Sequence, residues 1–390
     1  MKPKIIYLCY LPLMEIREKV FFIKEADDAG FSIEYWDLTK IYFPDIAFVG
    51  EVERCYVRKV ENHTELEKML SAQDIKRCFF VVIISFGGTV LKLHRLFTQY
   101  RCYLVFFART GFPLDYPDKS FFKKILKNYP KYLNIDKIKL ICLNQLAKIY
   151  KRTGLIKDYD LVFAAGAVDA SQYNGRSLVV SINHFDYDNY LDVKIQAVRI
   201  IKSEYCVFLD SNIVYDTDFK IINIRTIEAT AYFKSMGAFF DRLENKHHLK
   251  VVIAAHPKAE YQGSEFGDRE IIKGKTIELV KDCRFAIAHY STAISFAVLY
   301  KKPLLFIYTN EMKEMSYFKE ITNFASVLDA TSLNIDTIHG NDELQISSPN
   351  HLRYDEYKYK CLTSRSTEYK LSAGVFIQHM TELAASVLSR

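Results

Sequence analysis

Short apolar runs, each the length of a β-strand, alternate along the first half of the chain with segments whose apolar residues recur at helical spacing. The strand-like runs lie at residues 4–10, 31–36, 79–85, 103–107, 161–164 and 178–182. The helical segments lie between them, at residues 15–29, 65–71, 90–99 and 121–128. Strands that alternate with helices are typical of a parallel sheet. The pattern therefore predicts an α/β domain in this half.

A second series of the same kind begins near residue 200. Its strand-like runs lie at residues 205–209, 251–255, 285–288 and 304–307, and its helical segments at 226–244, 276–281 and 293–300. The polar, aromatic segment 184–192 fits a crossing between domains, and residues 369–388 predict a terminal helix. We therefore expect two Rossmann-like domains that face a cleft, at residues 1–190 and 191–350, and a C-terminal tail and helix at 351–390.

Composition and charge narrow the class of protein. Hydrophobic residues make up 49% of the chain, which supplies large cores and excludes disorder. The net charge of +6 is far below that of a dedicated nucleic-acid binder. No apolar run approaches the roughly 18 residues of a membrane-spanning helix, and the N-terminus lacks a signal-peptide pattern. Eight dispersed cysteines, without zinc spacing, predict reduced thiols in a cytoplasmic protein.

Two polar motifs follow predicted strands of the second domain. His256 and Pro257 come directly after the run 251–255, and an imidazole there can donate to a phosphate or a carboxylate. Ser291 and Thr292 lie where a strand gives way to a helix, a junction that favours phosphate. Each motif alone also fits a structural role, the hydroxyls as an N-cap and the histidine as a core residue. Together they predict a ligand site at the ends of two neighbouring strands.

The order strand, His-Pro, strand, Ser-Thr, helix, Lys-Pro, strand resembles the C-terminal nucleotide-binding domain of GT-B glycosyltransferases. It is most similar to bacterial enzymes that use CMP-activated acidic sugars, the sialyltransferases and Kdo transferases of capsule and O-antigen assembly. In those families both motifs contact the CMP group. The resemblance therefore implies that His256, Pro257, Ser291 and Thr292 bind CMP. Lys258, beside the His-Pro pair, is a further candidate to pair with an acidic donor.

Asp210 ends the apolar run 205–209 and is the candidate catalytic residue. A carboxylate at this place can be a general base, a nucleophile that forms a glycosyl-enzyme adduct, or a structural cap of the next turn. The segment resembles the region of retaining β-Kdo transferases in which an Asp after a buried strand is the nucleophile. Asn212, two residues further on, is a candidate substrate contact.

Three candidate substrate contacts in the first domain rest on position alone. Gly87 and Gly88 follow the run 79–85, where glycine permits close approach of a sugar, and Arg109 follows the run 103–107. Ordinary loop roles are the alternative for each. No GxGxxG motif is present, so a dinucleotide site is not indicated.

Two further patterns concern a metal ion and a membrane surface. The triplet Asp216-Thr217-Asp218 has the DxD pattern of metal-dependent GT-A enzymes, but it lies in a polar loop, and we expect neither a metal nor a cofactor. Basic stretches at 123–131 and 137–152, interleaved with Tyr and Leu, fit either contact with an anionic membrane surface or ordinary amphipathic surface helices.

The resemblance implies a metal-independent glycosyltransferase that transfers Kdo or another nonulosonic-type acidic sugar from a CMP-sugar, its co-substrate, to a lipopolysaccharide O-antigen or capsule acceptor. No nucleic-acid partner is expected. Three alternatives stay open. The first is the same fold with a UDP-sugar or another nucleotide donor, or acting as a polyol-phosphate transferase. The others are a non-catalytic polysaccharide-assembly protein and a GT-A enzyme.

Overall fold

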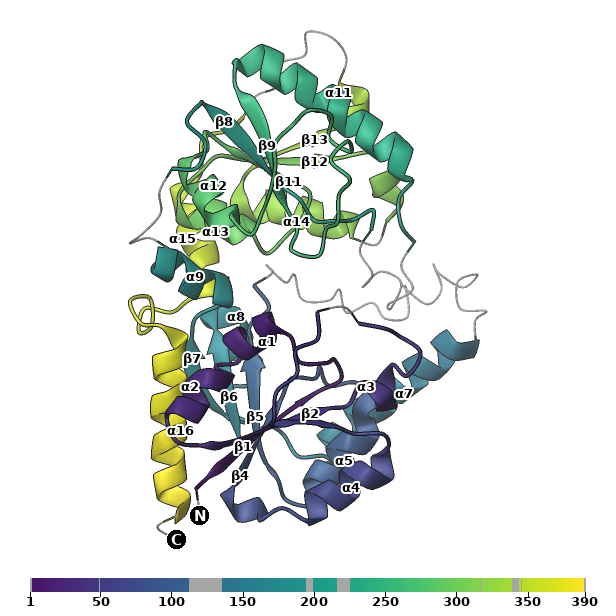
Figure 1. The fold of residues 1–390 in the computed structure, drawn as a ribbon, viewed down its shortest axis with the longest axis vertical. Helices are drawn as coiled ribbons and strands as arrows, with labels where there is room; N and C mark the ends of the chain where they lie inside the picture. The colour runs from purple at the N-terminus through teal and green to yellow at the C-terminus, as the bar shows by residue number, and fades with distance from the viewer. Residues whose placement is uncertain are drawn as a thin grey trace.

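Two parallel β-sheets form the centres of two domains in the computed structural model (Figure 1). The structure describes residues 2–48, 50–111, 135–193, 199–215, 225–315, 317–338, 344 and 346–388. The predicted helix at 121–128 lies outside these residues. None of the helices in the described ranges is long and apolar enough to cross a bilayer.

The N-terminal sheet has seven strands in the order β3-β2-β1-β4-β5-β6-β7. Their bounds are β1 Lys4–Cys9, β2 Ser32–Asp37, β3 Val57–Lys59, β4 Cys78–Val82, β5 Tyr103–Ala108, β6 Leu161–Ala165 and β7 Leu178–Ile182. The central strands are buried on both faces, which explains their continuous apolar runs. The short strand β3 was not predicted, because its residues Val57–Lys59 carry two exposed cations.

Helices cover both faces of this sheet. The helices on one face include α4 His63–Ser71 and α5 Leu91–Gln99, and those on the other are α1 Glu15–Val20, α2 Ile23–Asp28 and α16 Ser372–Leu388. The single helix predicted at 15–29 is wrong. Phe22 breaks it with φ 56°, because its ring packs between Phe107 and Phe376 in the core. Further short helices are α3 Thr39–Tyr42 and α8 Gly166–Ser171.

The C-terminal sheet has six strands in the order β10-β9-β8-β11-β12-β13. Their bounds are β8 Tyr205–Leu209, β9 Lys250–Ala255, β10 Ile271–Lys273, β11 Ala286–Ala288, β12 Leu304–Tyr308 and β13 Thr331–Asn334. Its helices include α11 Ala229–His247, α12 Thr276–Asp282, α13 Ile294–Leu299 and α14 Phe318–Leu328. The sequence predicted the four central strands and missed β10 and β13, which are short edge strands without an apolar run.

The chain passes twice between the domains. The first crossing, expected in residues 184–192, is the helix α9 Phe185–Val193. The second follows α15 His351–Tyr357 and a π-helical turn at Lys358–Leu362. Whereas α15 packs on α13 and α14 of the C-terminal domain, α16 inserts apolar side chains into the N-terminal core (Figure 1). The two domains therefore share the predicted C-terminal tail.

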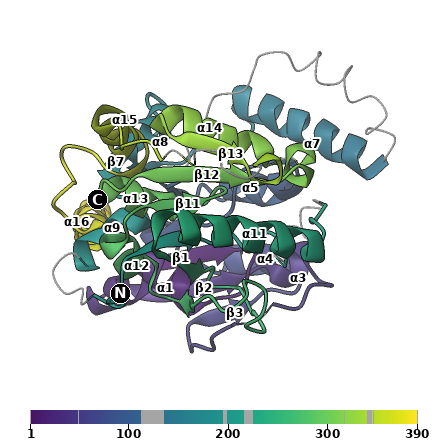
Figure 2. The same ribbon diagram turned by 90° about the horizontal axis from the view of Figure 1, so that it is seen from above.

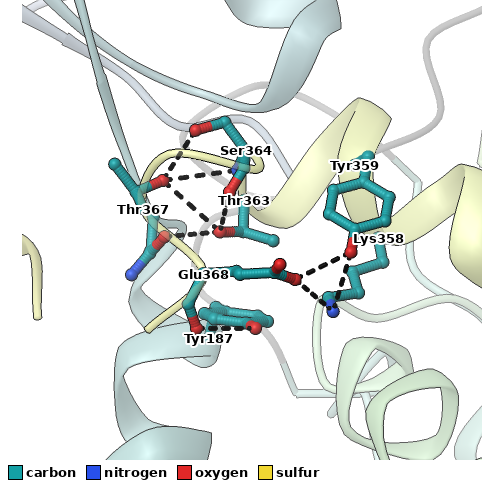
Figure 3. Close-up of polar contacts among 8 residues, drawn as sticks. Tyr187, Lys358, Tyr359, Thr363, Ser364, Thr367 and Glu368 are labelled. Atoms are coloured by element: carbon teal, nitrogen blue, oxygen red, sulfur yellow. Dashed lines mark hydrogen bonds and ion pairs between the residues drawn. The ribbon is translucent and has the colours of Figure 1, made fainter. Parts of the chain in front are cut away.

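Hydrogen bonds tie the second crossing to the first (Figure 3). The Thr363 hydroxyl donates to Oδ1 of Asn183 at 2.7 Å, and the Tyr187 hydroxyl donates to the carbonyl of Glu368 at 3.0 Å. Lys358 forms an ion pair with the Glu368 carboxylate at 3.0 Å. Because these hydrogen bonds join groups from both crossings, the junction is one hydrogen-bonded unit and not two separate linkers.

Candidate functional site

The ends of three adjacent strands gather most of the candidate residues. Strands β9, β8 and β11 lie side by side, and the loops that follow them carry His256, Asp210 and Ser291. Parallel strands end at the same edge of a sheet, so these loops meet there. His256 and Ser291 were expected on neighbouring strands. That detail is wrong, because β8 with Asp210 lies between them. We call residues 210–212, 256–258 and 291–292 the strand-end cluster.

Asp210 joins two loops of the strand-end cluster. It is 5% exposed, and its Oδ1 accepts the backbone N–H of Asn212 at 2.8 Å. Its Oδ2 accepts the backbone N–H of His256 at 3.1 Å and the hydroxyl of Tyr261 at 2.7 Å. Burial and the Asp210 charge raise the pKa of Tyr261, so the phenol stays protonated and donates. Of the three roles considered, this geometry favours a cap that positions the His256 loop.

Ser211 joins the third loop. Its hydroxyl donates to the carbonyl of Tyr290 at 2.5 Å, directly before Ser291. The Ser291 hydroxyl accepts the backbone N–H of Ala293 at 3.2 Å. Helix α13 begins at Ile294 with Ala293 as its N-cap, so neither Ser291 nor Thr292 is the N-cap residue. Both hydroxyl residues are half-buried at the edge of the sheet.

The geometry of the His256 ring assigns its tautomer. The backbone N–H of Lys258 donates to Nδ1 at 3.3 Å, so in the neutral ring Nε2 carries the hydrogen. An Nε2–H group is a donor suited to a phosphate or carboxylate oxygen. His256 is half-buried, whereas Pro257 and Lys258 are exposed. Asp210 holds the backbone of His256, and this contact fixes the place from which the ring projects.

Asn212 contributes an unsatisfied acceptor. It is 3% exposed with φ 50°, and its Oδ1 accepts no hydrogen bond from any residue that the structure describes. A buried acceptor without a partner costs about 1–3 kcal/mol. A ligand with a hydroxyl or amino donor would remove that cost, so Asn212 remains a candidate substrate contact.

His289 and Tyr232 support the cluster from within the core and were missed by sequence reasoning. Nε2 of His289 lies 2.8 Å from the Tyr232 hydroxyl, and Nδ1 lies 2.6 Å from the carbonyl of Ile307. Burial lowers the pKa of His289 to about 4, so the ring is neutral and bridges a donor and an acceptor. The pair fixes α11 to the ends of β11 and β12. The only signal in the sequence was a histidine directly after an apolar run.

Gly87 and Gly88 lie close to a helix. The backbone N–H of Gly88 donates to Oδ1 of Asn144 at 2.7 Å, on helix α7 Ile135–Arg152. A Cβ at Gly88 would lie 2.4 Å from the carbonyl carbon of Leu143, and one at Gly87 would lie 3.3 Å from Asn144. The close approach predicted for a sugar is thus made by α7. Contact of Gly87 and Gly88 with a substrate stays a prediction.

Arg109 also lies apart from the strand-end cluster. Its guanidinium packs on the rings of Phe107, Phe21 and Phe22 and donates to the carbonyl of Val20. It lines a small cavity of about 110 Å³ beside α9 and the start of α16. Burial lowers its pKa to about 10, which leaves it charged at neutral pH. Its place near the junction, against three aromatic rings, does not support direct contact with a donor at the cluster.

The DxD triplet of Asp216, Thr217 and Asp218 lies outside the residues that the structure describes. Within the described part of the chain, no group of three or more His, Cys, Asp or Glu side chains is arranged to hold a metal ion.

Comparison with solved structures shows the class of fold. CalG4, the calicheamicin glycosyltransferase, matches with a TM-score of 0.52 at 10% identity, over 100% of this chain and 99% of that chain. A variant of the wall teichoic acid polymerase TagF matches with a TM-score of 0.52 at 10% identity, over 100% of this chain and 90% of that one. No protein-family model and no curated protein matches the sequence. The predicted pair of Rossmann-like domains in a GT-B arrangement is confirmed.

Proposed function

We propose that the protein is a glycosyltransferase that transfers Kdo or another nonulosonic-type acidic sugar from a CMP-sugar to a surface-glycan acceptor. One observation carries the proposal. The two motifs that resemble CMP-binding motifs lie at one edge of the C-terminal sheet, tied to the strand between them by Asp210 and Ser211. This chain shares the fold of CalG4, which is named a glycosyltransferase, and of TagF, which is named a wall teichoic acid polymerase.

The strand-end cluster offers donors that fit an anionic leaving group. The Nε2–H of His256, the hydroxyls of Ser291 and Thr292 and the cation of Lys258 would bind phosphate oxygens or the sugar carboxylate. Such fixed donors offset the charge that develops on the leaving CMP without a metal ion. A cytoplasmic location is part of the proposal, and cysteines that form no disulfide with one another in the described part of the chain fit a reducing compartment.

Ligand-induced stabilisation tests the donor. Thermal unfolding of the whole chain with CMP, UDP or GDP should show stabilisation by CMP, reaching about 2.7 kcal/mol at a hundredfold excess over Kd. His256→Ala and Ser291→Ala should weaken this effect. His351→Ala, an exposed histidine on α15, is the matched control and should not. Stabilisation by UDP and not by CMP would replace the donor with the UDP alternative.

A second candidate is a polysaccharide-assembly protein that keeps the fold without transferring a sugar. One observation favours it: the carboxylate of Asp210, the expected catalytic group, is already engaged by three donors. Release of CMP from a CMP-sugar, followed with and without a glycan acceptor, separates the two. CMP binding without any hydrolysis or transfer would favour the non-catalytic protein.

A further inference from the structure

Helix α7 presents an unpartnered face to solvent. Figures 1 and 2 show it extending outward from the N-terminal domain. It contacts the domain along one side, where Ala147 is fully buried and Asn144 binds Gly88. On the opposite side of the helix, the structure describes the side chains from Ile138 onward.

The outward side carries an apolar stripe, which we define as Ile138, Cys142, Leu146 and Ile149. These positions recur at intervals of four, four and three residues, the spacing of one helix face. Ile138 is 47% exposed and Ile149 is 53% exposed. Water-exposed aliphatic side chains in one line on a projecting helix mark a surface that buries against something.

Cations border the stripe on both sides. The 100° rotation per residue places Lys139 along one border and Lys148 and Arg152 along the other, and all three are exposed. Residues 138–152 include no Asp or Glu. Among the ion pairs between described residues, the one from this stretch joins Lys151 to Asp158 at 3.0 Å, on the side that faces the domain.

We propose that the apolar stripe of α7 lies on an anionic lipid bilayer, with its aliphatic side chains among the acyl chains and its cations at the headgroups. Protein interfaces are depleted in lysine, whereas at a bilayer a lysine keeps its charge at the surface while its stem covers apolar area. An apolar stripe with a rim of Lys and Arg, and no acid, therefore complements anionic lipid better than a protein surface. The proposal stands independently of the donor sugar.

Vesicle co-sedimentation of the whole chain tests the proposal. We expect binding to vesicles that contain roughly a third anionic phospholipid, little binding to purely zwitterionic vesicles, and loss of binding as salt is raised. No nucleotide or sugar is present, so the result does not depend on the proposed transferase activity. Absence of binding to anionic vesicles, or equal binding to zwitterionic ones, would overturn the proposal.

Apolar variants locate the surface. Ile138→Gln with Ile149→Gln should lower the partition coefficient by about tenfold or more. The matched control replaces two aliphatic residues of similar or greater exposure on other helices, Ile16→Gln on α1 and Leu352→Gln on α15, and should bind like the wild type. Equal loss in both pairs would show that α7 is not the docking face.

Charge variants test the lipid headgroup. Each Lys near an anionic surface contributes about fivefold to partitioning, so Lys139→Gln with Lys148→Gln should cost roughly 25-fold. The control, Lys234→Gln with Lys246→Gln on α11, should cost nothing. Thermal unfolding of every variant confirms that the fold is intact. Self-association in sedimentation that the apolar variants abolish, without vesicle binding, would assign the stripe to a second copy of the chain and overturn the proposal.

Discussion

The contacts of Asp210 lead to a prediction that separates a positioning role from a catalytic one. Tyr261→Phe removes the hydroxyl that donates to Oδ2 and leaves the ring, which packs on Phe266 with centroids 5.3 Å apart. Asp210→Asn keeps the size of the side chain but replaces one acceptor oxygen with a donor. The two variants perturb the same network from its two ends.

The expected magnitudes follow from burial and the number of donors. A hydrogen bond to a charged, buried acceptor contributes about 1.5–3 kcal/mol, so Tyr261→Phe should lower the free energy of unfolding by about 2 kcal/mol. In Asp210→Asn, either orientation of the amide turns its NH₂ toward a backbone N–H, that of Asn212 or that of His256. At least one buried donor then loses its acceptor, and we expect a loss of roughly 3 kcal/mol or more.

Chemical unfolding and steady-state transfer kinetics form the assay. If Asp210 positions the His256 loop, both variants should raise the KM for the donor more than they lower kcat. Tyr369→Phe, at a side chain that is 87% exposed, is the control and should leave stability and kinetics unchanged. The reasoning fails if Tyr261→Phe is neutral. It also fails if Asp210→Asn abolishes kcat at unchanged stability and KM, because that result identifies a base or nucleophile.

Two further predictions concern buried groups away from the cluster. Burial raises the pKa of Asp186 to about 7, against about 3.9 when unfolded, so the folded state holds the extra proton and the wild type loses stability as pH rises from 4 to 7. The side chain of the Asp186→Asn variant cannot ionise. Between pH 4 and pH 8, the free energy of unfolding of the variant minus that of the wild type should therefore rise by up to about 4 kcal/mol. A difference that stays constant with pH in urea titrations would contradict this. Gly88→Ala should cost about 1–3 kcal/mol, because the new Cβ would lie 2.4 Å from the backbone of Leu143. Gly237→Ala, inside α11 with open space around it, should instead stabilise by roughly 0.5–1 kcal/mol, and equal thermal shifts in the two variants would refute the packing argument.

The sequence predicted the fold class well because buried parallel strands leave a direct trace in it. Central strands such as β8 and β9 are apolar at nearly every position, so their runs were visible without any structure. The break at Phe22 was not visible, because tertiary packing of an aromatic ring and not local propensity interrupts the helix. Edge strands were missed for a related reason, since they bury few side chains and therefore contain no continuous apolar run.

The sequence predicted the place of the candidate residues in the sheet better than it predicted their hydrogen-bond partners. Residues that follow strands were correctly expected at one edge of the sheet, because topology alone brings strand ends together. The partner of Asp210 was not predictable, since Tyr261 lies 51 residues away in a loop without periodicity. The neighbour of Gly88 was not predictable either, since α7, from 56 residues downstream, occupies the space beside the turn that follows the strand.

The strand-end cluster is anchored both within the C-terminal sheet and on the interdomain helix α9. His256 is held by Asp210 at the end of β8, within the C-terminal sheet. The backbone carbonyl of Thr292 accepts the N–H of Ser295 at 2.9 Å, and the Ser295 hydroxyl donates to Asp186 on the interdomain helix α9 at 2.9 Å. These contacts connect α9 to the Ser291-Thr292 loop, which Ser211 also holds to the end of β8. If the proposed donor phosphate lies between the two motifs, we expect domain orientation and donor affinity to be coupled, with the Ser295–Asp186 contact as one of the contacts of α9 that link them.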